Sequence, residues 1–336
     1  MYQYLHDRSG RPARQNPRII RLAHHTEVNR EFAESVVRGL SRRPGRLECR
    51  FLYDARGSEL YERITEQPEY YPTRTEAGIL AGCARRLRAI TGPVTLLELG
   101  SGSSVKTDHL LRAWQGKAHY VPVDVSESAL RLAGEAICRR HPDVQVVGLN
   151  GTYEAALPFF AEFSPLMVVF LGGTIGNLSD EETDLFFRQV GDNLGEGDYF
   201  LLGVDLVKDR RLLEAAYNDE AGVTAAFTCN LFARMNRELD SGLDLSAIEH
   251  VARWVPARQR IEIHARFKKR QTLRVAPLER SFEIARDEEI LVEISRKFIL
   301  EELQADLADH GLRTREIFTD AQSWFALLLL EKSSPR

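Results

Sequence analysis

Cysteine is scarce in this sequence, and long apolar runs are absent. The four cysteines among 336 residues are Cys49, Cys83, Cys138 and Cys229. They form no CxxC pair, which argues against a disulfide framework and against a cysteine-based zinc site. The longest wholly apolar run has seven residues, 324–330, whereas a membrane helix needs about 20. No apolar leader with a cleavage site opens the chain, so we expect a cytoplasmic protein without a membrane partner.

Neither sign of charge dominates. The net charge is −4 and the sequence pI is about 6.2, whereas proteins that bind nucleic acid are usually basic. The first 50 residues are an exception, with eleven arginines against five acidic residues. We interpret this segment as a solvated face and leave a contact with an anionic partner open. The adjacent His24 and His25 have no third ligand nearby, so no metal is expected. The predicted partner is a small-molecule substrate rather than nucleic acid, and the predicted state is a monomer.

The pattern of apolar residues divides the chain. Residues 1–20 read as an extended or poorly ordered arm, and helices are predicted at 28–40, 57–66 and 75–90. Short apolar runs then alternate with helical stretches. The five strands predicted in this region are 94–100, 119–125, 144–149, 166–172 and 198–205. Such alternation is typical of a doubly wound parallel sheet in an α/β fold.

The alternation stops after Asp205. Residues 209–250 read as helical, 251–296 as an antiparallel patch, and 297–310 as a helix. Two last strands, 313–319 and 323–331, are separated by a turn too short for a parallel crossover, so they predict an antiparallel hairpin. A Rossmann-like sheet that ends in such a hairpin is the architecture of class I methyltransferases.

This architecture predicts a division of the chain into a methyltransferase core and a second, α+β substrate-binding domain. Residues 1–74 would be an N-terminal arm and helices that belong to the substrate domain. The core would comprise 75–207 and 297–336, and 208–296 would be the inserted part of the substrate domain.

A glycine-containing turn closes the first predicted strand, where ligands bind in open α/β sheets. Gly100 and Gly102, with Ser101 between them, allow close approach of the backbone to a ligand. Asp124 closes the second strand and can accept hydrogen bonds from ribose hydroxyls, although it also suits the N-terminus of the next helix. The turn lacks the third glycine of G-x-G-x-x-G. Together with the terminal hairpin, this favours S-adenosylmethionine as the cofactor over a dinucleotide.

Three more positions follow predicted strands. Lys106 follows the glycine turn and could pair with the methionine carboxylate of the cofactor, or be an ordinary surface lysine. Thr152 and Tyr153 fall where methyltransferases contact adenine, as a hydrogen-bonding and a packing group respectively. The segment LGGTIGN (171–177) lies where the methyl acceptor normally meets the cofactor. It is not the Asn/Asp-Pro-Pro-aromatic motif with which many nucleic-acid methyltransferases stack a flipped base.

A more specific resemblance rests on seven strings: LYDARGSELYERIT (52–65), PEYYPTRTEAGIL (68–80), LELGSGSSVKT (97–107), YVPVDVSESAL (120–130), FLGGTIGNL (170–178), LLGVDLVKD (201–209) and AYNDEAGVTAAF (216–227). Over about residues 30–331 the chain resembles the histidine N-alpha-methyltransferases of ergothioneine biosynthesis. The resemblance implies transfer of three methyl groups from S-adenosylmethionine to the α-amino group of L-histidine, giving hercynine.

The resemblance also implies roles for particular residues. Those on the substrate side would be Tyr70, Gly172, Asn177, Tyr217, Ile263, Glu293 and Ser295. Among these, Gly172 and Asn177 would hold the amino and carboxylate end, and Tyr217 the carboxylate. Glu293 and Ser295 would meet the imidazole, and Ile263 would line the ring pocket. Those on the cofactor side would be Tyr53, Gly100, Ser101, Gly102, Lys106, Asp124, Thr152 and Tyr153. The catalytic candidates are Tyr53, Asn177 and Tyr217.

Two departures from the family pattern bear on these roles. Some members have Asp-Phe where this chain has Thr152-Tyr153, and some have methionine where Ile263 stands. In the expected reaction the neutral α-amine attacks the sulfonium methyl in line, after its proton has passed to solvent or to a tyrosine such as Tyr53.

Three other functions remain open at this point. They are N-methylation of a different amino acid or amine, non-catalytic binding of S-adenosylmethionine, and RNA methylation through the basic segment.

Overall fold

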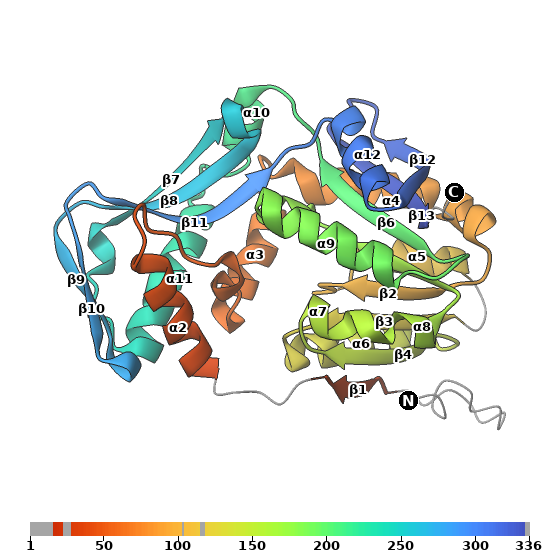
Figure 1. The fold of residues 1–336 in the computed structure, drawn as a ribbon, viewed down its shortest axis with the longest axis horizontal. Helices are drawn as coiled ribbons and strands as arrows, with labels where there is room; N and C mark the ends of the chain where they lie inside the picture. The colour runs from red at the N-terminus through yellow and green to blue at the C-terminus, as the bar shows by residue number, and fades with distance from the viewer. Residues whose placement is uncertain (1–15, 23–27, 103, 115–117, 333–336) are drawn as a thin grey trace.

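The computed structural model describes residues 16–22, 28–102, 104–114 and 118–332. In these ranges, one half of the molecule is built on a mixed eight-stranded sheet, and the other half holds two small antiparallel sheets (Figure 1).

The large sheet has the strand order β1-β4-β3-β2-β5-β6-β13-β12. Its strands are β1 (Arg18–Arg21), β2 (Thr95–Leu99), β3 (His119–Asp124), β4 (Gln145–Asn150), β5 (Leu166–Phe170), β6 (Tyr199–Asp205), β12 (Leu312–Thr319) and β13 (Phe325–Lys332). Strands β1 to β6 pair in parallel, whereas β13 is antiparallel to both β6 and β12. The predicted class I methyltransferase sheet with its terminal hairpin is therefore confirmed.

Helices cover both faces of this sheet, which is why its strands are nearly continuous apolar runs. The sequence of β5 is LMVVF, and all five residues are buried. One face packs against α4 (Tyr71–Thr91), α5 (Thr107–Trp114) and α6 (Glu127–Arg140). The other face packs against α7 (Tyr153–Ala156), η2 (Leu157–Phe159), α8 (Phe160–Phe163), α9 (Asp180–Asn193) and α12 (Leu300–Asp309).

Residues 1–20 were expected to form an extended or poorly ordered arm, and residues 18–21 are extended as the edge strand β1, which the sequence did not identify as part of the sheet. Ile19 pairs in parallel with Gly148 of β4, and the ring of Pro17 lies against Gly134, where a Cβ would approach within 2.6 Å of it. Two isoleucines between arginines are too short a pattern to identify a strand, and its pairing partner lies more than a hundred residues away. Residues 1–15 and the pair His24–His25 lie outside the described ranges.

The second half contains a three-stranded sheet in the order β11-β8-β7 and a β9–β10 pair. Its strands are β7 (Ile248–Val255), β8 (Arg260–Phe267), β9 (Gln271–Val275), β10 (Arg280–Ile284) and β11 (Glu289–Arg296). Its helices are α2 (Val28–Leu40), η1 (Cys49–Leu52), α3 (Ala55–Thr65), α10 (Arg210–Ala215) and α11 (Val223–Leu239), with short turns η4 (Leu245–Ala247), η5 (Pro256–Arg258) and η6 (Ala276–Leu278). One hydrophobic core joins N-terminal residues such as Phe32 to inserted residues such as Phe232 and Phe267. The domain boundaries at 74, 207 and 296 stay a prediction.

Helix α4 begins at Tyr71, four residues before the predicted start. Pro72 occupies the first turn, where its fixed φ is favourable and its missing N–H costs no helical hydrogen bond. Tyr71 belongs to the core of the second half, whereas Ile79 and Leu87 of the same helix pack under the large sheet. The helix thus belongs to both halves.

Candidate active site

The C-terminal ends of the parallel strands meet on one side of the large sheet, and β2 ends on the side that faces α3 (Figure 1). Ligands of open α/β sheets bind at this side. Apart from Tyr53, which follows η1 in the second half, the predicted cofactor residues lie at or after the ends of β2, β3 and β4, and the predicted substrate residues come from the segment of η3 (Thr174–Asn177) and from the second half.

The loop after β2 is held by Asp124 at the end of β3. Gly100 and Gly102 have φ angles of +69° and +48°, which favour glycine. The N–H of Gly102 donates to Asp124 Oδ2 at 3.1 Å, and the N–H of Ser126 donates to Oδ1 at 2.8 Å. Burial raises the pKa of Asp124, while these backbone donors oppose the rise. The carboxylate therefore accepts a backbone N–H at the N-terminus of α6 and holds the glycine loop in place. Each of its oxygens keeps a lone pair that can accept from a ligand hydroxyl.

The hydroxyl of Ser101 is buried and has no hydrogen-bond partner among the described residues. A buried hydroxyl without a partner is costly, so a polar ligand group at this loop would satisfy it. The glycine loop, Ser101 and Asp124 together fit the nucleoside and amino-acid parts of S-adenosylmethionine.

Tyr153 and Thr152 follow β4. A Cβ at Gly100 would lie 2.6 Å from the Tyr153 hydroxyl oxygen, so the tyrosine reaches the glycine loop only because residue 100 is glycine. The Tyr153 ring packs edge-to-face on Phe170, with centroids 5.4 Å apart. The Thr152 hydroxyl accepts the N–H of Ala155 at 3.4 Å and caps α7. The adenine contacts of both residues stay predictions.

Lys106 is bound to a carboxylate that the sequence analysis missed. Its Nζ lies 2.5 Å from Oε2 of Glu76, whose side chain is fully buried in α4. Glu76 also accepts the N–H of Gly172 at 2.9 Å. Burial alone would lower the pKa of Lys106, but the charge of Glu76 raises it overall. The Glu76 side chain fits here because residue 203 of β6 is glycine, since a Cβ at that position would lie 2.2 Å from Oε1 of Glu76.

Five aromatic rings line the second half of the site. Tyr53 packs edge-to-face on Tyr61 and Phe227, with centroid distances of 5.5 and 5.3 Å. Tyr70 packs in the same way on Tyr61 at 6.5 Å and on Tyr217 at 6.1 Å. The structure therefore brings the three predicted tyrosines together, and Tyr61 and Phe227 are additional members of the cluster. Their spacing in α3 and α11 is that of ordinary core residues, so no local signal marks them.

Glu293 and Ile263 face each other across β11 and β8. They are register partners, so their side chains lie on the same face of the small sheet. Burial raises the pKa of Glu293 from 4.5 to about 7, and the charge of Lys297 opposes that rise. Burial raises the pKa values of Tyr53 and Cys49, and the nearby Glu293 charge adds to both. Glu293 is thus a half-buried carboxyl group that shares a face of the small sheet with Ile263 and acts electrostatically on Tyr53 of the tyrosine cluster.

Ser295 and Tyr217 meet at their hydroxyls. The two oxygens are 2.7 Å apart. The fully buried Lys297 Nζ donates to Tyr217 at 2.9 Å and to Ser295 at 2.8 Å, and it forms an ion pair with Asp205 at 2.8 Å. Tyr71 donates its hydroxyl hydrogen to the same Asp205. Tyr71 is therefore a core residue, whereas its neighbour Tyr70 joins the site cluster.

Asn177 ends the short helix η3 after β5. Gly176, next to it, packs so closely on β11 that a Cβ would lie 2.9 Å from the carbonyl oxygen of Arg296. Gly172 has a φ of +80°, and a Cβ there would lie 3.3 Å from Lys106 Nζ. The turn that holds Gly172 and Asn177 thus touches the cofactor side at one end and the strand of Glu293 and Ser295 at the other.

A sequence model of the family described as histidine-specific, S-adenosylmethionine-dependent methyltransferases matches residues 32–332. The chain belongs to this family. The predicted family resemblance and the predicted methyl donor are thereby confirmed.

Named relatives agree with the family assignment. The Histidine N-alpha-methyltransferase of Mycolicibacterium smegmatis is 44% identical over 294 residues, which cover 87% of this chain and 92% of that protein. Ergothioneine biosynthesis protein 1 of Neurospora crassa is 34% identical over 56% of this chain, but this covers only 22% of that longer protein. The 4-dimethylallyltryptophan N-methyltransferase of Epichloe festucae var. lolii is 26% identical over 86% of this chain and 91% of that protein.

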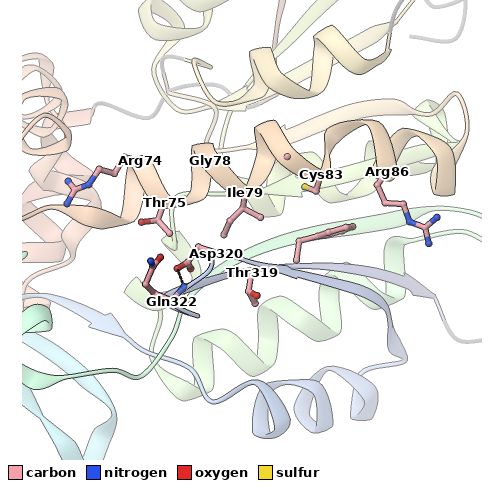
Figure 2. Close-up of a pocket in the computed structure, with 11 residues that line it drawn as sticks. Arg74, Thr75, Gly78, Ile79, Cys83, Arg86, Thr319, Asp320 and Gln322 are labelled. Carbon is pink, nitrogen blue, oxygen red and sulfur yellow. Dashed lines mark hydrogen bonds between the residues drawn. The ribbon is translucent and has the colours of Figure 1, made fainter.

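A separate groove lies between α4 and the β12–β13 turn (Figure 2). It is lined by residues such as Gly78, Ile79 and Thr319, and it contains none of the predicted site residues. Over the described ranges, no group of three or more potential metal-ligating side chains occurs, and no helix is long and apolar enough to cross a membrane.

Proposed function

We propose that this protein transfers three methyl groups from S-adenosylmethionine to the α-amino group of L-histidine, giving hercynine for ergothioneine biosynthesis. The observation that carries the proposal is that Glu293 is the register partner of Ile263 and lies two residues from Ser295, whose hydroxyl contacts that of Tyr217. An imidazole needs an apolar surface for its ring and an acceptor for its N–H, and Ile263 and Glu293 supply these.

The cofactor side is the loop of Gly100, Ser101 and Gly102 together with Asp124. Asp124 would accept from the ribose hydroxyls, and Lys106, held by Glu76, would face the methionine carboxylate. When bound, S-adenosylmethionine supplies an electrophilic methyl group on a sulfonium sulfur.

The tyrosine cluster suits the amino group of the substrate. Each transfer enlarges this group, and the last makes it a quaternary ammonium that carries a charge without N–H donors. Aromatic faces bind such cations through cation–π attraction, and Tyr53, Tyr70 and Tyr217 belong to one ring cluster, in which Tyr217 also contacts Ser295.

Proton removal must precede each attack, because an ammonium nitrogen has no lone pair. Burial and Glu293 raise the pKa of Tyr53, so its phenol stays protonated at neutral pH and is no strong base. We therefore assign Tyr53 to orienting the amine through its oxygen, while the proton passes to solvent. The N–C bond then forms as the C–S bond breaks, with positioning as the main contribution of the protein.

One alternative has a specific observation in its favour. A relative named for a tryptophan derivative aligns over most of this chain, so the same scaffold could accept another aromatic amino acid. The position that separates the two candidates is Glu293, because an imidazole uses the acceptor and an indole needs it less. We also propose a cytoplasmic monomer; four free thiols are consistent with a reducing compartment.

The test is mass spectrometry of L-histidine incubated with the purified protein and S-adenosylmethionine. Successive products with one, two and three added methyl groups, the last matching hercynine, would support the proposal. Methylation of tryptophan in preference to histidine would support the alternative. Cofactor binding without methylation of any amino acid would contradict both and leave a binding protein. Salt-sensitive RNA methylation would point to the basic N-terminal segment.

A further inference from the structure

We infer that Lys297 is a positioning residue that makes the site selective for substrates with a free α-carboxylate. It would do so by holding the hydroxyls of Tyr217 and Ser295 and by placing a positive charge behind them. This inference rests on the proposed function, because it concerns the carboxylate of the same amino-acid substrate.

The hydrogen bonds of Lys297 join the predicted substrate side of the site to the large sheet. Its side chain is fully buried, and its three N–H donors have three acceptors within 2.9 Å: Tyr217 OH, Ser295 Oγ and Asp205 Oδ2. Its Nζ also lies 4.9 Å from the centroid of the Tyr217 ring. Lys297 follows β11 directly and so lies where the second half of the molecule joins the large sheet.

Hydrogen counting shows what the two hydroxyls can offer. Both oxygens accept from Lys297, and one hydroxyl hydrogen lies in the 2.7 Å contact between them. One hydroxyl hydrogen remains, and within the described part of the chain it has no acceptor. With Ser295 as the donor in that contact, the remaining hydrogen belongs to Tyr217, the predicted carboxylate contact, and a carboxylate oxygen is the substrate atom that it fits, while the Ser295 oxygen stays available to the imidazole N–H.

Charge counting gives the same result. Asp205 is the carboxylate partner of two buried ammonium groups, because Lys208 pairs with it as well as Lys297. Two other carboxyl groups interact with this cluster electrostatically. Asp320 acts on Lys208. Burial raises the pKa of Glu293 to about 7, and the charge of Lys297 opposes that rise. Because Asp320 acts on Lys208, and Glu293 is protonated or engaged with an imidazole, the carboxylate bonded to Lys297 is the Asp205 that it shares with Lys208, and the α-carboxylate of the substrate would give Lys297 a further negative partner.

The competing explanation is that Lys297 merely neutralises Asp205, and Lys208 provides the matched control. Lys208 pairs with the same Asp205, and it donates to Tyr71 OH at 2.9 Å and to the Leu206 carbonyl at 2.6 Å. None of these groups is predicted to touch the substrate. A purely structural role would make the two lysines equivalent, whereas a carboxylate-selecting role would not.

The experiment compares Lys297→Met with Lys208→Met by calorimetry, using protein saturated with S-adenosylhomocysteine. The ligands are L-histidine and histamine, which has the same ring and amine but no carboxylate. For Lys297→Met we expect histidine affinity to fall by about 10- to 100-fold, the range for charged hydrogen bonds, and histamine affinity to fall by less than about threefold. Lys208→Met should change neither by more than about threefold, and both variants should keep their S-adenosylhomocysteine affinity.

Folding is expected to survive in Lys297→Met, because Asp205 keeps Lys208 and Tyr71 as partners. Lys297→Gln is the second variant, which keeps a neutral donor while removing the charge, and its loss should also be specific to histidine. Equal losses for both ligands, equal losses in both lysine variants, or no loss would overturn the inference. Wild-type protein that binds histamine as tightly as histidine would overturn it without any variant. Hercynine production by wild type, with unchanged histidine affinity in Lys297→Met, would reject this inference and leave the proposed function standing.

Discussion

Replacing Glu293 with glutamine should make the protein more stable at alkaline pH, because the wild-type carboxyl group ionises at a cost in the folded state. Burial raises its pKa from 4.5 to about 7, so the folded protein holds this proton more tightly than the unfolded chain does. The stability from that proton is fully present below about pH 4.5 and is lost as the pH rises through about 7. Glutamine has the same shape and does not ionise, so the variant avoids the loss.

The magnitude follows from the two pKa values. Their difference, at ~1.4 kcal/mol per pKa unit, corresponds to about 3 kcal/mol in the free energy of unfolding at full ionisation. Because Glu293 is only half-buried, water reduces this figure, and we expect ~2 kcal/mol at pH 8. Urea unfolding followed by circular dichroism at pH 8 and pH 4.5 measures it. The stability gain of Glu293→Gln should be present at pH 8 and close to zero at pH 4.5.

Glu289 on the same strand provides a control of opposite sign. Its carboxylate pairs with Arg253, which lowers its pKa although burial opposes the change. The ionised Glu289 carboxylate therefore contributes to folding stability at pH 8, and this contribution is lost in acid. At pH 8, Glu289→Gln should be less stable than the wild-type protein. A stability difference for Glu293→Gln that does not change with pH, or that has the same sign as the control, would refute the raised pKa of Glu293 in the folded protein.

Three further predictions concern other residues. Asp124→Ala should weaken S-adenosylmethionine binding by about 1–3 kcal/mol in calorimetry, and an unchanged affinity would remove this residue from the site. Glu293→Ala should lower kcat/KM for histidine by roughly 30- to 1000-fold and raise the relative activity on tryptophan; an unchanged ratio would mean that another group reads the side chain. Gly203→Ala should displace Glu76, lowering stability by about 1–3 kcal/mol and weakening cofactor binding, whereas the unobstructed helical Gly78→Ala should stabilise the protein by up to about 1 kcal/mol.

The sequence predicted the large sheet well because its signals are local. Short apolar strands ended in glycine or aspartate at the expected spacing, and the terminal hairpin followed from the length of one turn. The features that the sequence did not predict share a cause. Strand β1 forms by pairing with β4, and the role of Glu76 depends on its contacts with Lys106 and Gly172, which are 30 and 96 residues away in the sequence. No local pattern encodes such contacts.

The site residues divide in the same way. Glu293, Ser295 and Ile263 came from a family resemblance, and their shared face followed from strand geometry. Lys297, two residues beyond Ser295, was missed because a lone lysine is usually solvated. Its burial becomes visible only when Asp205 from β6 and Tyr217 from the inserted segment are brought to it.

Helix α4 also has a mechanical consequence. Tyr71 at its start packs in the core of the second half and donates to Asp205 at the end of β6, and Glu76, about 7.5 Å further along the same helix, is bonded to Lys106 and to the N–H of Gly172. A rotation of the tyrosine-lined half about the sheet would therefore turn α4 and move the backbone N–H of Gly172 with it. If histidine binds beside Tyr70 and S-adenosylmethionine beside Lys106, as proposed, both ligands contact residues joined through this helix, and any effect of one ligand on the affinity of the other must be reciprocal.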